Sequence, residues 1–279
     1  MTSPVKAPNK GINKRKIVSL LKDGKRLDGR GLFEYRDIHV ESGVSINAEG
    51  SARVKIGKTE VIVGVKMDVQ EPYPDHEDEG TMITGMEFSP LSGERYESGP
   101  PQMDSIEVAR VVDRGIRESG FIDWKKLCIK KGEKVWSILI DIYCINDDGN
   151  VIDASALGAV AALKSARFPE YDEKLEKVKF GEFSDKPLPL TDNLPLTLTF
   201  NKIGNSLILD PTREEEDAMD TRMIIAVSCP KKDKIINAMQ KGGITPITID
   251  EMNKMIEQSE KTYDEIFPKI AKKISALKR

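Results

Sequence analysis

Residues 134–166 read KVWSILIDIYCINDDGNVIDASALGAVAALKSA, and this stretch decides the fold. Its first part, up to Asp147, is a long apolar run rich in Val and Ile, which predicts a buried β-strand. Its last part, from Asp153 to Ala166, is rich in Ala and other small residues that let a helix pack closely against a sheet. A buried strand followed directly by such a helix predicts an α/β protein.

Two runs with period-two alternation lie upstream of this stretch. They are VSINAEGSARVKIG at 44–57 and KTEVIVGVKMDV at 58–69, and the turn signal Gly57-Lys58 separates them. Alternation of this kind is typical of strands joined by a turn, so a β-hairpin is predicted. The stretch at 71–101 mixes Pro, Gly and acidic residues, and we expect part of it to be strand and part a long loop.

Another helix is predicted from about Asp104 to Ser119. Glu107 follows Asp104 by three residues, which is the spacing of a capping box. An apolar stripe at helical spacing gives this helix a face to bury. The stripe consists of Ile106, Ala109, Val112 and Ile116.

The two ends of the chain are also predicted to be helical. NKRKIVSLLKDG at 13–24 has the pattern of a short amphipathic helix ended by Gly24. Near the other end, Thr248 and Glu251 have capping-box spacing, and Pro268 is expected to interrupt the helix. Strands are predicted at 196–210 and 223–229, beyond the polar stretch at 182–195. We therefore expect a helical arm at 1–25 and two α/β halves, at 26–190 and 191–279.

Composition limits the classes of function. With a formal charge of −3, the protein lacks the positive field of an autonomous nucleic-acid binder. Any RNA contact must therefore be local, and DNA is not an expected partner. No apolar run approaches the roughly 20 residues of a membrane helix, and the start has no apolar core for secretion, so a cytoplasmic protein is expected. Three Cys without C-x-x-C spacing, and two His outside any ligand pattern, predict no metal site.

Five blocks of sequence resemble the RNase PH family, and more specifically the non-catalytic RNase PH-type subunit of the archaeal exosome ring. They extend over most of the chain in the order that the family has. The resemblance implies an α/β (α+β) fold of RNase PH type, with two β-α subdomains whose mixed sheets pack against helices. The blocks are RLDGRGLFEYRDI at 26–38, AEGSARVKIGKTEVIVGVK at 48–66, RVVDRGIRES at 110–119, DGNVIDASALGA at 148–159 and LDPTREEEDAMD at 209–220.

The fourth block departs from the phosphate site of catalytic relatives, which have D-G-G-[ST]-R-x-A-S. In that motif, backbone N–H groups, a hydroxyl and a guanidinium bind the phosphate at a helix N-terminus. Asp148 and Gly149 match, but the hydroxyl and arginine donors are absent. The residues that follow are Asn150, Val151, Ile152 and Asp153. We expect Ile152 to be a core residue and Asp153 to cap the helix, where its carboxylate would repel phosphate.

The fifth block departs from the acidic site of catalytic relatives, where two aspartates six residues apart serve acid catalysis or hold Mg²⁺. Asp220 fits the downstream position, but the residue six before it is Glu214, and Asp217 is only three before it. The block also looks shorter than its catalytic counterpart. A solvated acidic loop is the preferred interpretation, and a vestigial Mg²⁺ site is the alternative.

A basic stripe lies on the helix of the third block. Arg110, Arg114 and Arg117 are four and three residues apart, so they share one face, away from the apolar stripe. Guanidinium groups bind backbone phosphates without regard to sequence, which suits a degrader of any RNA, so Arg110, Arg114 and Arg117 are the candidate RNA-binding residues. The resemblance implies that Arg110 and Arg114 contact RNA. The alternative is pairing within the helix, as between Asp113 and Arg117.

These observations predict a subunit that is not an enzyme on its own. The resemblance implies a six-membered ring of three heterodimers, in which a catalytic RNase PH-like partner uses phosphate, and possibly Mg²⁺, to shorten single-stranded RNA from its 3′ end. RNA-binding cap subunits are implied on one face, and the chain itself is expected to need no cofactor. Two alternatives remain: a phosphorolytic exoribonuclease with a divergent phosphate site, and a homo-oligomeric RNA-binding scaffold.

Overall fold

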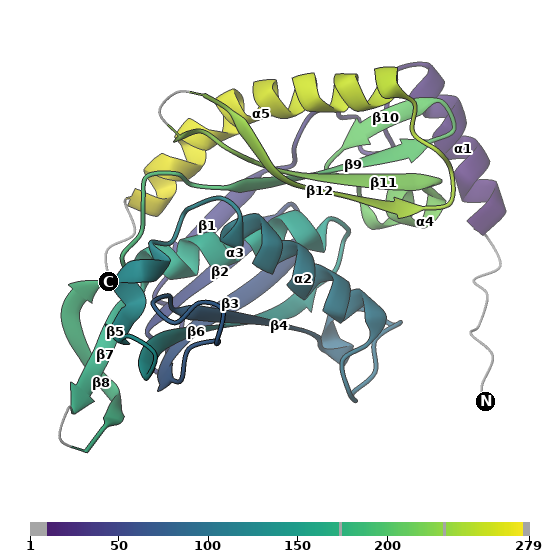
Figure 1. Cartoon of the computed structure of the whole chain (residues 1–279). Helices are drawn as coiled ribbons and strands as arrows, with labels where there is room; N and C mark the ends of the chain where they lie inside the picture. The colour runs from purple at the N-terminus through teal and green to yellow at the C-terminus, as the bar shows by residue number, and fades with distance from the viewer. Residues whose placement is uncertain (1–9, 173–174, 231–232, 276–279) are drawn as a thin grey trace.

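The computed structural model describes residues 10–172, 175–230 and 233–275 (Figure 1). Its first sheet is built around β6 (Lys134–Asn146), the strand predicted from the opening stretch. The order across this sheet is β1-β2-β3-β6-β4, and β5 (Cys128–Lys130) also pairs with β6. The other strands are β1 (Ile38–Ser42), β2 (Gly50–Ile56), β3 (Thr59–Gln70) and β4 (Thr81–Phe88). Only β4 pairs in parallel among the described strands, so the sheet is mixed as expected.

The predicted hairpin is present as β2 and β3. They pair antiparallel from Gly50↔Val65 to Ile56↔Thr59. Gly57 has a φ of 58°, in the left-handed region that glycine adopts without steric cost, and a turn begins there as the sequence indicates. Alternate residues of β3 are fully buried, so one face of the sheet belongs to the core.

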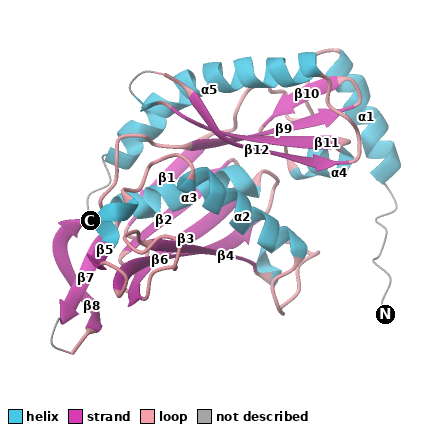
Figure 2. Ribbon diagram, in the orientation of Figure 1, coloured by secondary structure: helices cyan, strands magenta, loops and turns pink. Residues whose placement is uncertain are grey.

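Helices α2 (Met103–Arg117) and α3 (Val151–Ser165) cover that face (Figure 2). Helix α3 is buried along its whole length up to Leu163, which explains its richness in small residues. The predicted apolar stripe of α2 is confirmed at Ala109, Val112 and Ile116, but the capping box and the burial of Ile106 were predicted wrongly. The residue before the helix is Gln102, and no side chain caps it. Ile106 is 44% exposed, because the buried face is formed by Val108, Val111 and Val112 with their neighbours.

The second sheet is antiparallel throughout, not mixed. Its order is β10-β9-β11-β12. The strands are β9 (Leu196–Ile203), β10 (Ser206–Leu209), β11 (Thr221–Ser228) and β12 (Ile235–Gly243). Helix α5 (Ile249–Ser275) packs on one side of this sheet, and α1 (Lys10–Lys22) lies near β10 (Figure 1). Helix α5 continues past Pro268, so the expectation that this proline interrupts the helix was wrong.

A β-hairpin projects from the body beside the first sheet (Figure 1). It consists of β7 (Arg167–Asp172) and β8 (Lys177–Pro187), and its second strand includes the first part of the polar stretch at 182–195. Short 3-10 helices occur at Pro90–Ser92 (η1) and Trp124–Leu127 (η2). None of the described helices is both long enough and apolar enough to cross a membrane.

The two sheets share one continuous core. The largest cluster of buried apolar residues includes Val63 and Ile140 from the first sheet and Phe200 and Ile225 from the second. A smaller cluster lies between α1, β10 and α4 (Arg213–Ala218). The boundaries predicted at 25/26 and 190/191 stay a prediction. Residues 1–9 of the predicted arm and 276–279 of the predicted C-terminal part lie outside the described residues.

Candidate functional site

The candidate site begins at the turn that joins β6 to α3. Gly149 has a φ of +84°, and a Cβ there would lie 2.4 Å from the backbone C of Thr212 and 2.5 Å from the backbone N of Arg213. The glycine is therefore required by the close approach of α4 as well as by its own conformation. Asn150 also has a positive φ, of 59°, and α3 begins at Val151. The first turn of α3 thus lies directly against α4.

A carboxylate from α4 already binds the N-terminal end of α3. The backbone N–H of Asn150 donates to Oε1 of Glu216 at 2.8 Å. The backbone N–H of Arg213 donates in return to the carbonyl of Asp148 at 3.0 Å. Burial raises the pKa of Glu216, while the Arg213 guanidinium and the Asn150 N–H oppose that shift. The Glu216 carboxylate therefore already accepts a hydrogen bond from a backbone N–H at the place where the family motif binds phosphate.

Asp153 does not cap α3, so that expectation was wrong. The structure places its carboxylate in the first turn of the helix, where it accepts from the Thr199 N–H at 3.0 Å and the Thr199 hydroxyl at 2.7 Å. It also accepts from Asn150 Nδ2 at 2.9 Å and from the Tyr35 hydroxyl. Burial raises the pKa of Asp153 to about 7, although these hydrogen bonds favour the ionised form. Asp153 therefore connects α3 to the second sheet.

Ile152 is buried, as expected of a core residue, and Val151 is buried as well. Both line a cavity of about 200 Å³ beside α4. Two guanidinium groups border this cavity. Arg213 contacts Asp147 at 3.1 Å and Glu216 at 2.9 Å, and Arg222 contacts Glu107 at 2.6 Å. Each of these arginines is thus paired with a carboxylate of the same chain, and neither presents an unpaired charge to an incoming anion.

The acidic block is not a solvated loop, and that preferred interpretation was wrong. It forms the short helix α4, in which Thr212 and Glu215 make a capping box. Glu215 is 1% exposed and pairs with the buried Arg26. Asp217 lies within hydrogen-bonding distance of Arg95 Nη2 and Arg213 Nη2. Glu214 and Asp217 are exposed to solvent as the sequence suggested, whereas Glu215 and Glu216 are not.

Asp220 lies apart from the other acidic residues, beyond the end of α4. Its carboxylate pairs with Lys14 of α1 at 2.6 Å and accepts the Gly204 N–H at 2.7 Å. Burial would raise its pKa, but these two contacts lower it. Glu214, Asp217 and Asp220 are therefore not brought together. Within the described ranges, no group of three or more His, Cys, Asp or Glu residues could hold a metal ion.

The arginine stripe divides into two parts. Arg117 pairs with Asp113 at 2.9 Å, donates to the Met82 carbonyl and lies over the ring of Trp124. Arg117 is therefore paired with Asp113 within the helix, which is the alternative to RNA contact. The side chains of Arg110 and Arg114 are exposed and form no ion pair or hydrogen bond with any other described residue. They line one hollow of about 450 Å³, together with Asp104, Glu107 and Gln240. Glu107, which lies three residues before Arg110 on the same helix, binds Arg222 and Gln240 instead.

Residues 34–169 match domain 1, and residues 193–262 domain 2, of the 3′ exoribonuclease (RNase PH) family. The chain belongs to the RNase PH family. The "Exosome complex component Rrp42" of Methanocella arvoryzae is 46% identical over 245 residues, which cover 88% of this chain and 90% of that protein. The protein of that name from Archaeoglobus fulgidus is 47% identical over 232 residues, 83% of this chain and 85% of that protein.

Solved structures agree with this family assignment. A chain of "archaeoglobus fulgidus exosome with RNA bound to the active site" superposes with a TM-score of 0.84 at 41% identity, covering 93% of this chain and 98% of that one. A chain of "Archaeal exosome core" gives a TM-score of 0.81 at 39% identity, covering 94% and 97%. The RNase PH-type α/β fold expected from the sequence is therefore confirmed.

The residues that sequence reasoning missed form a buried polar network between the two halves. Arg36 donates to both carboxylate oxygens of Asp210 and to the carbonyls of Asp148 and Gly149, at distances of 2.7–3.0 Å. Asp210 also accepts from Arg30 and from Asn150 Nδ2. The signal was present, because both arginines lie in the first family block and Asp210 in the fifth. Nothing in the sequence indicated that those two blocks would be adjacent.

Proposed function

We propose that this protein is a non-catalytic component of an archaeal-type exosome, a complex that degrades RNA by 3′-to-5′ phosphorolysis. One observation carries the non-catalytic role. The place where the family motif binds phosphate is filled from within, by Glu216 on the Asn150 N–H and by Ile152 in place of the arginine. A phosphate there would have to displace a carboxylate and face several others, so phosphorolysis must be performed by another chain.

That other chain is a catalytic RNase PH-like subunit, which alternates with this protein in a ring of three heterodimers. The names of the relatives and the exosome structures that superpose on this chain support that assembly. The partner supplies the phosphate-binding and acidic residues, together with any Mg²⁺. RNA-binding cap subunits join one face of the ring, and the complex acts in the cytoplasm.

The chain's own contribution to RNA is Arg110 and Arg114. They are exposed on α2 and form no ion pair with another described residue, so binding an RNA phosphate would break no existing interaction. Two guanidinium groups one helical turn apart hold a single strand by its backbone and leave the bases unread. The pairing of Arg117 with Asp113 assigns it a structural contact instead.

Phosphate-dependent shortening of a single-stranded RNA tests the non-catalytic role. We expect the isolated chain to show no activity and the assembly with its catalytic partner to be active. Robust phosphorolysis by the isolated chain would instead support the alternative of an enzyme with a divergent phosphate site. A stable homo-oligomer that binds RNA without the partner would support the scaffold alternative.

A double charge reversal tests the arginines. Arg110→Glu with Arg114→Glu should weaken RNA binding by the assembled ring and reduce the slope of log affinity against log salt by about 1.4, since each phosphate contact to a single strand contributes about 0.7. Ring assembly should be unchanged. Arg15→Glu with Lys16→Glu, two exposed positions on α1, is the matched control. An RNA affinity and salt slope equal to those of the control would refute the assignment.

A further inference from the structure

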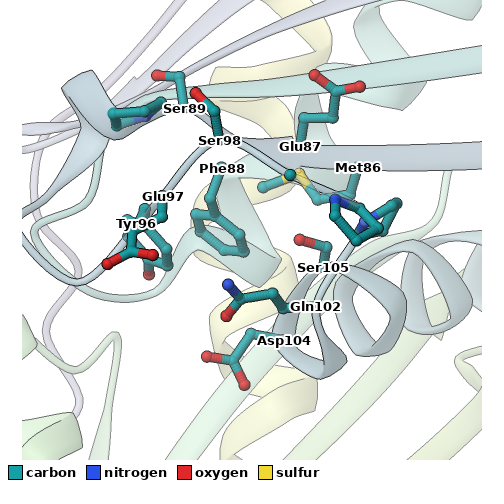
Figure 3. A pocket seen from close by; sticks show the side chains of 14 residues that line it. Met86, Glu87, Phe88, Ser89, Tyr96, Glu97, Ser98, Gln102, Asp104 and Ser105 are labelled. Carbon is teal, nitrogen blue, oxygen red and sulfur yellow. The ribbon is translucent and has the colours of Figure 1, made fainter. Parts of the chain in front are cut away.

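A second groove lies on the other side of the α2 N-terminus from Arg110 and Arg114. It is a cavity of about 200 Å³ between the end of β4 and the loop that leads into α2 (Figure 3). Stacked rings of Phe88 and Tyr96 form part of its wall, with centroids 4.3 Å apart and planes inclined by 8°. The hydroxyl of Tyr96 donates to Asp147 at 2.6 Å, so this wall is fixed to the end of β6.

The lining of this groove is acidic. Three carboxylates border it, from Glu87, Glu97 and Asp104, and no Lys or Arg is among the lining residues. None of the three forms an ion pair with a residue in the described part of the chain. Asp104 lines both this groove and the hollow that holds Arg110. The acidic groove therefore adjoins the hollow in which Arg110 and Arg114 lie, at one helix end.

A polar group inside the groove also lacks a partner. Ser105 is only 5% exposed and lines the cavity, yet its hydroxyl makes no hydrogen bond to any described residue. This hydroxyl is therefore available to a group that enters the groove. In Figure 3 the side chains of Ser105, Gln102 and Asp104 lie on one side of the Phe88 ring. They supply hydrogen-bonding groups beside an aromatic surface.

The strand that borders the groove is an edge strand. β4 has a strand neighbour on one side only, β6, and Ile83 on it is 48% exposed. Beside it, Asp141 of β6 has a raised pKa, caused by burial and by the nearby Glu87 carboxylate. Like charges without a counter-ion make this edge electrostatically unfavourable in the isolated chain. Exposed edges with apolar side chains are sites where another chain can be added.

We propose that this groove docks an arginine side chain of the catalytic partner subunit, with the partner's chain lying along the β4 edge. A guanidinium fits the observed chemistry, because it stacks on aromatic rings, binds carboxylates through two N–H groups and can donate to the Ser105 hydroxyl. RNA is excluded, because three carboxylates repel its phosphates. This inference rests on the ring assembly proposed above and assigns one contact within it.

The association of the two subunits tests this contact. Glu87→Lys with Glu97→Lys should weaken binding of the purified catalytic subunit about tenfold or more and reduce the salt dependence of that binding. Glu257→Lys with Glu265→Lys, at two exposed positions on α5, makes the same change of charge elsewhere and should bind as the unmodified chain does. Thermal unfolding of each variant checks that it is folded. The neutral pair Glu87→Gln with Glu97→Gln gives a second, milder test at low salt.

The outcomes separate the two proposals. If the unmodified chain and the α5 control assemble and both groove variants assemble with equal affinity, the docking inference is overturned and the ring proposal stands. If the unmodified chain fails to associate with the catalytic subunit, the ring proposal fails and this inference fails with it. If the groove variants assemble normally but bind RNA differently, the groove serves RNA and the docking inference is overturned.

Discussion

At the scale of single residues, two carboxylates of this chain are bound at the start of α3, one of them to a backbone N–H at the place where the family motif binds phosphate. Glu216 binds the Asn150 N–H, and Asp153 gathers four hydrogen-bond donors from Tyr35, Asn150 and Thr199. Burial outweighs these donors and raises the pKa of Asp153 to about 7. A carboxyl group that is buried so fully needs hydrogen-bond partners, and the groups around Asp153 supply them.

The raised pKa of Asp153 predicts a pH dependence of stability. Between about pH 4 and pH 7 the folded state keeps a proton that the unfolded state has lost, so the free energy of unfolding should fall as pH rises. The slope should reach about 1.4 kcal/mol per pH unit for this one group. Denaturant titrations across that range should show that the free energy of unfolding of Asp153→Asn lacks this dependence on pH. If the free energy of unfolding fell equally with pH in the variant and in the unmodified chain, the prediction would be contradicted.

At the scale of elements, the close contact of α3 with the first sheet depends on small residues. A Cβ added at Gly50 of β2 would lie 2.3 Å from the carbonyl of Ala162 and 2.6 Å from Cβ of Ala166. The obstacle is largely backbone, which cannot move aside as a flexible side chain can. The close contact between β2 and α3 therefore requires small residues on both elements, here Gly50 on the strand and Ala162 on the helix.

Gly50→Ala should therefore destabilise the protein by about 1–3 kcal/mol, because the added methyl overpacks the contact between β2 and α3. The free energy of unfolding from denaturant titration measures the effect. Gly99→Ala is the matched control, since a Cβ there meets nothing within 4 Å. Equal stability of the two variants would show that α3 can shift away from the sheet at little cost.

At the scale of the whole molecule, the buried polar network joins the two halves. Arg36 belongs to the segment before the first sheet, Asp148 and Gly149 to the turn between β6 and α3, and Asp210 directly follows β10. Arg26 adds a parallel connection to Glu215 and to the Leu209 carbonyl. Both halves also share one apolar core, so we expect them to unfold together.

Arg36→Ala should test this connection. The Arg36 and Asp210 side chains are 8% and 0% exposed, and breaking a buried pair leaves a poorly compensated charge, at a cost of roughly 3 kcal/mol or more. A single unfolding transition should remain, shifted to lower denaturant. Arg167→Ala, which removes an exposed pair with Asp185, should change stability by less than about 1 kcal/mol. Two separate transitions in the Arg36 variant would mean that the halves fold independently.

Sequence patterns predicted the elements with strong periodicity. The central strand at 134–146, the hairpin around Gly57, the helix after Asp148 and the capping box of Thr248 with Glu251 all occur in the structure. The errors lie where tertiary contacts override local preference. Ile106 is exposed because α2 turns Val108 and Val111 toward the core. The acidic block is helical because Thr212 caps it and Arg26 neutralises Glu215.

By itself the sequence determined the family resemblance, the loss of the phosphate-site arginine at Ile152 and the positions of Arg110 and Arg114 on one helix face, because motifs and periodicity are local properties. Only the tertiary structure decided which of the α2 arginines stay without an ion pair. Asp113 pairs with Arg117, and Glu107 binds Arg222 and Gln240 from the second sheet, so Arg110 and Arg114 are left exposed. Ion pairing depends on distances of a few ångströms between segments far apart in sequence, and the fold alone sets those distances.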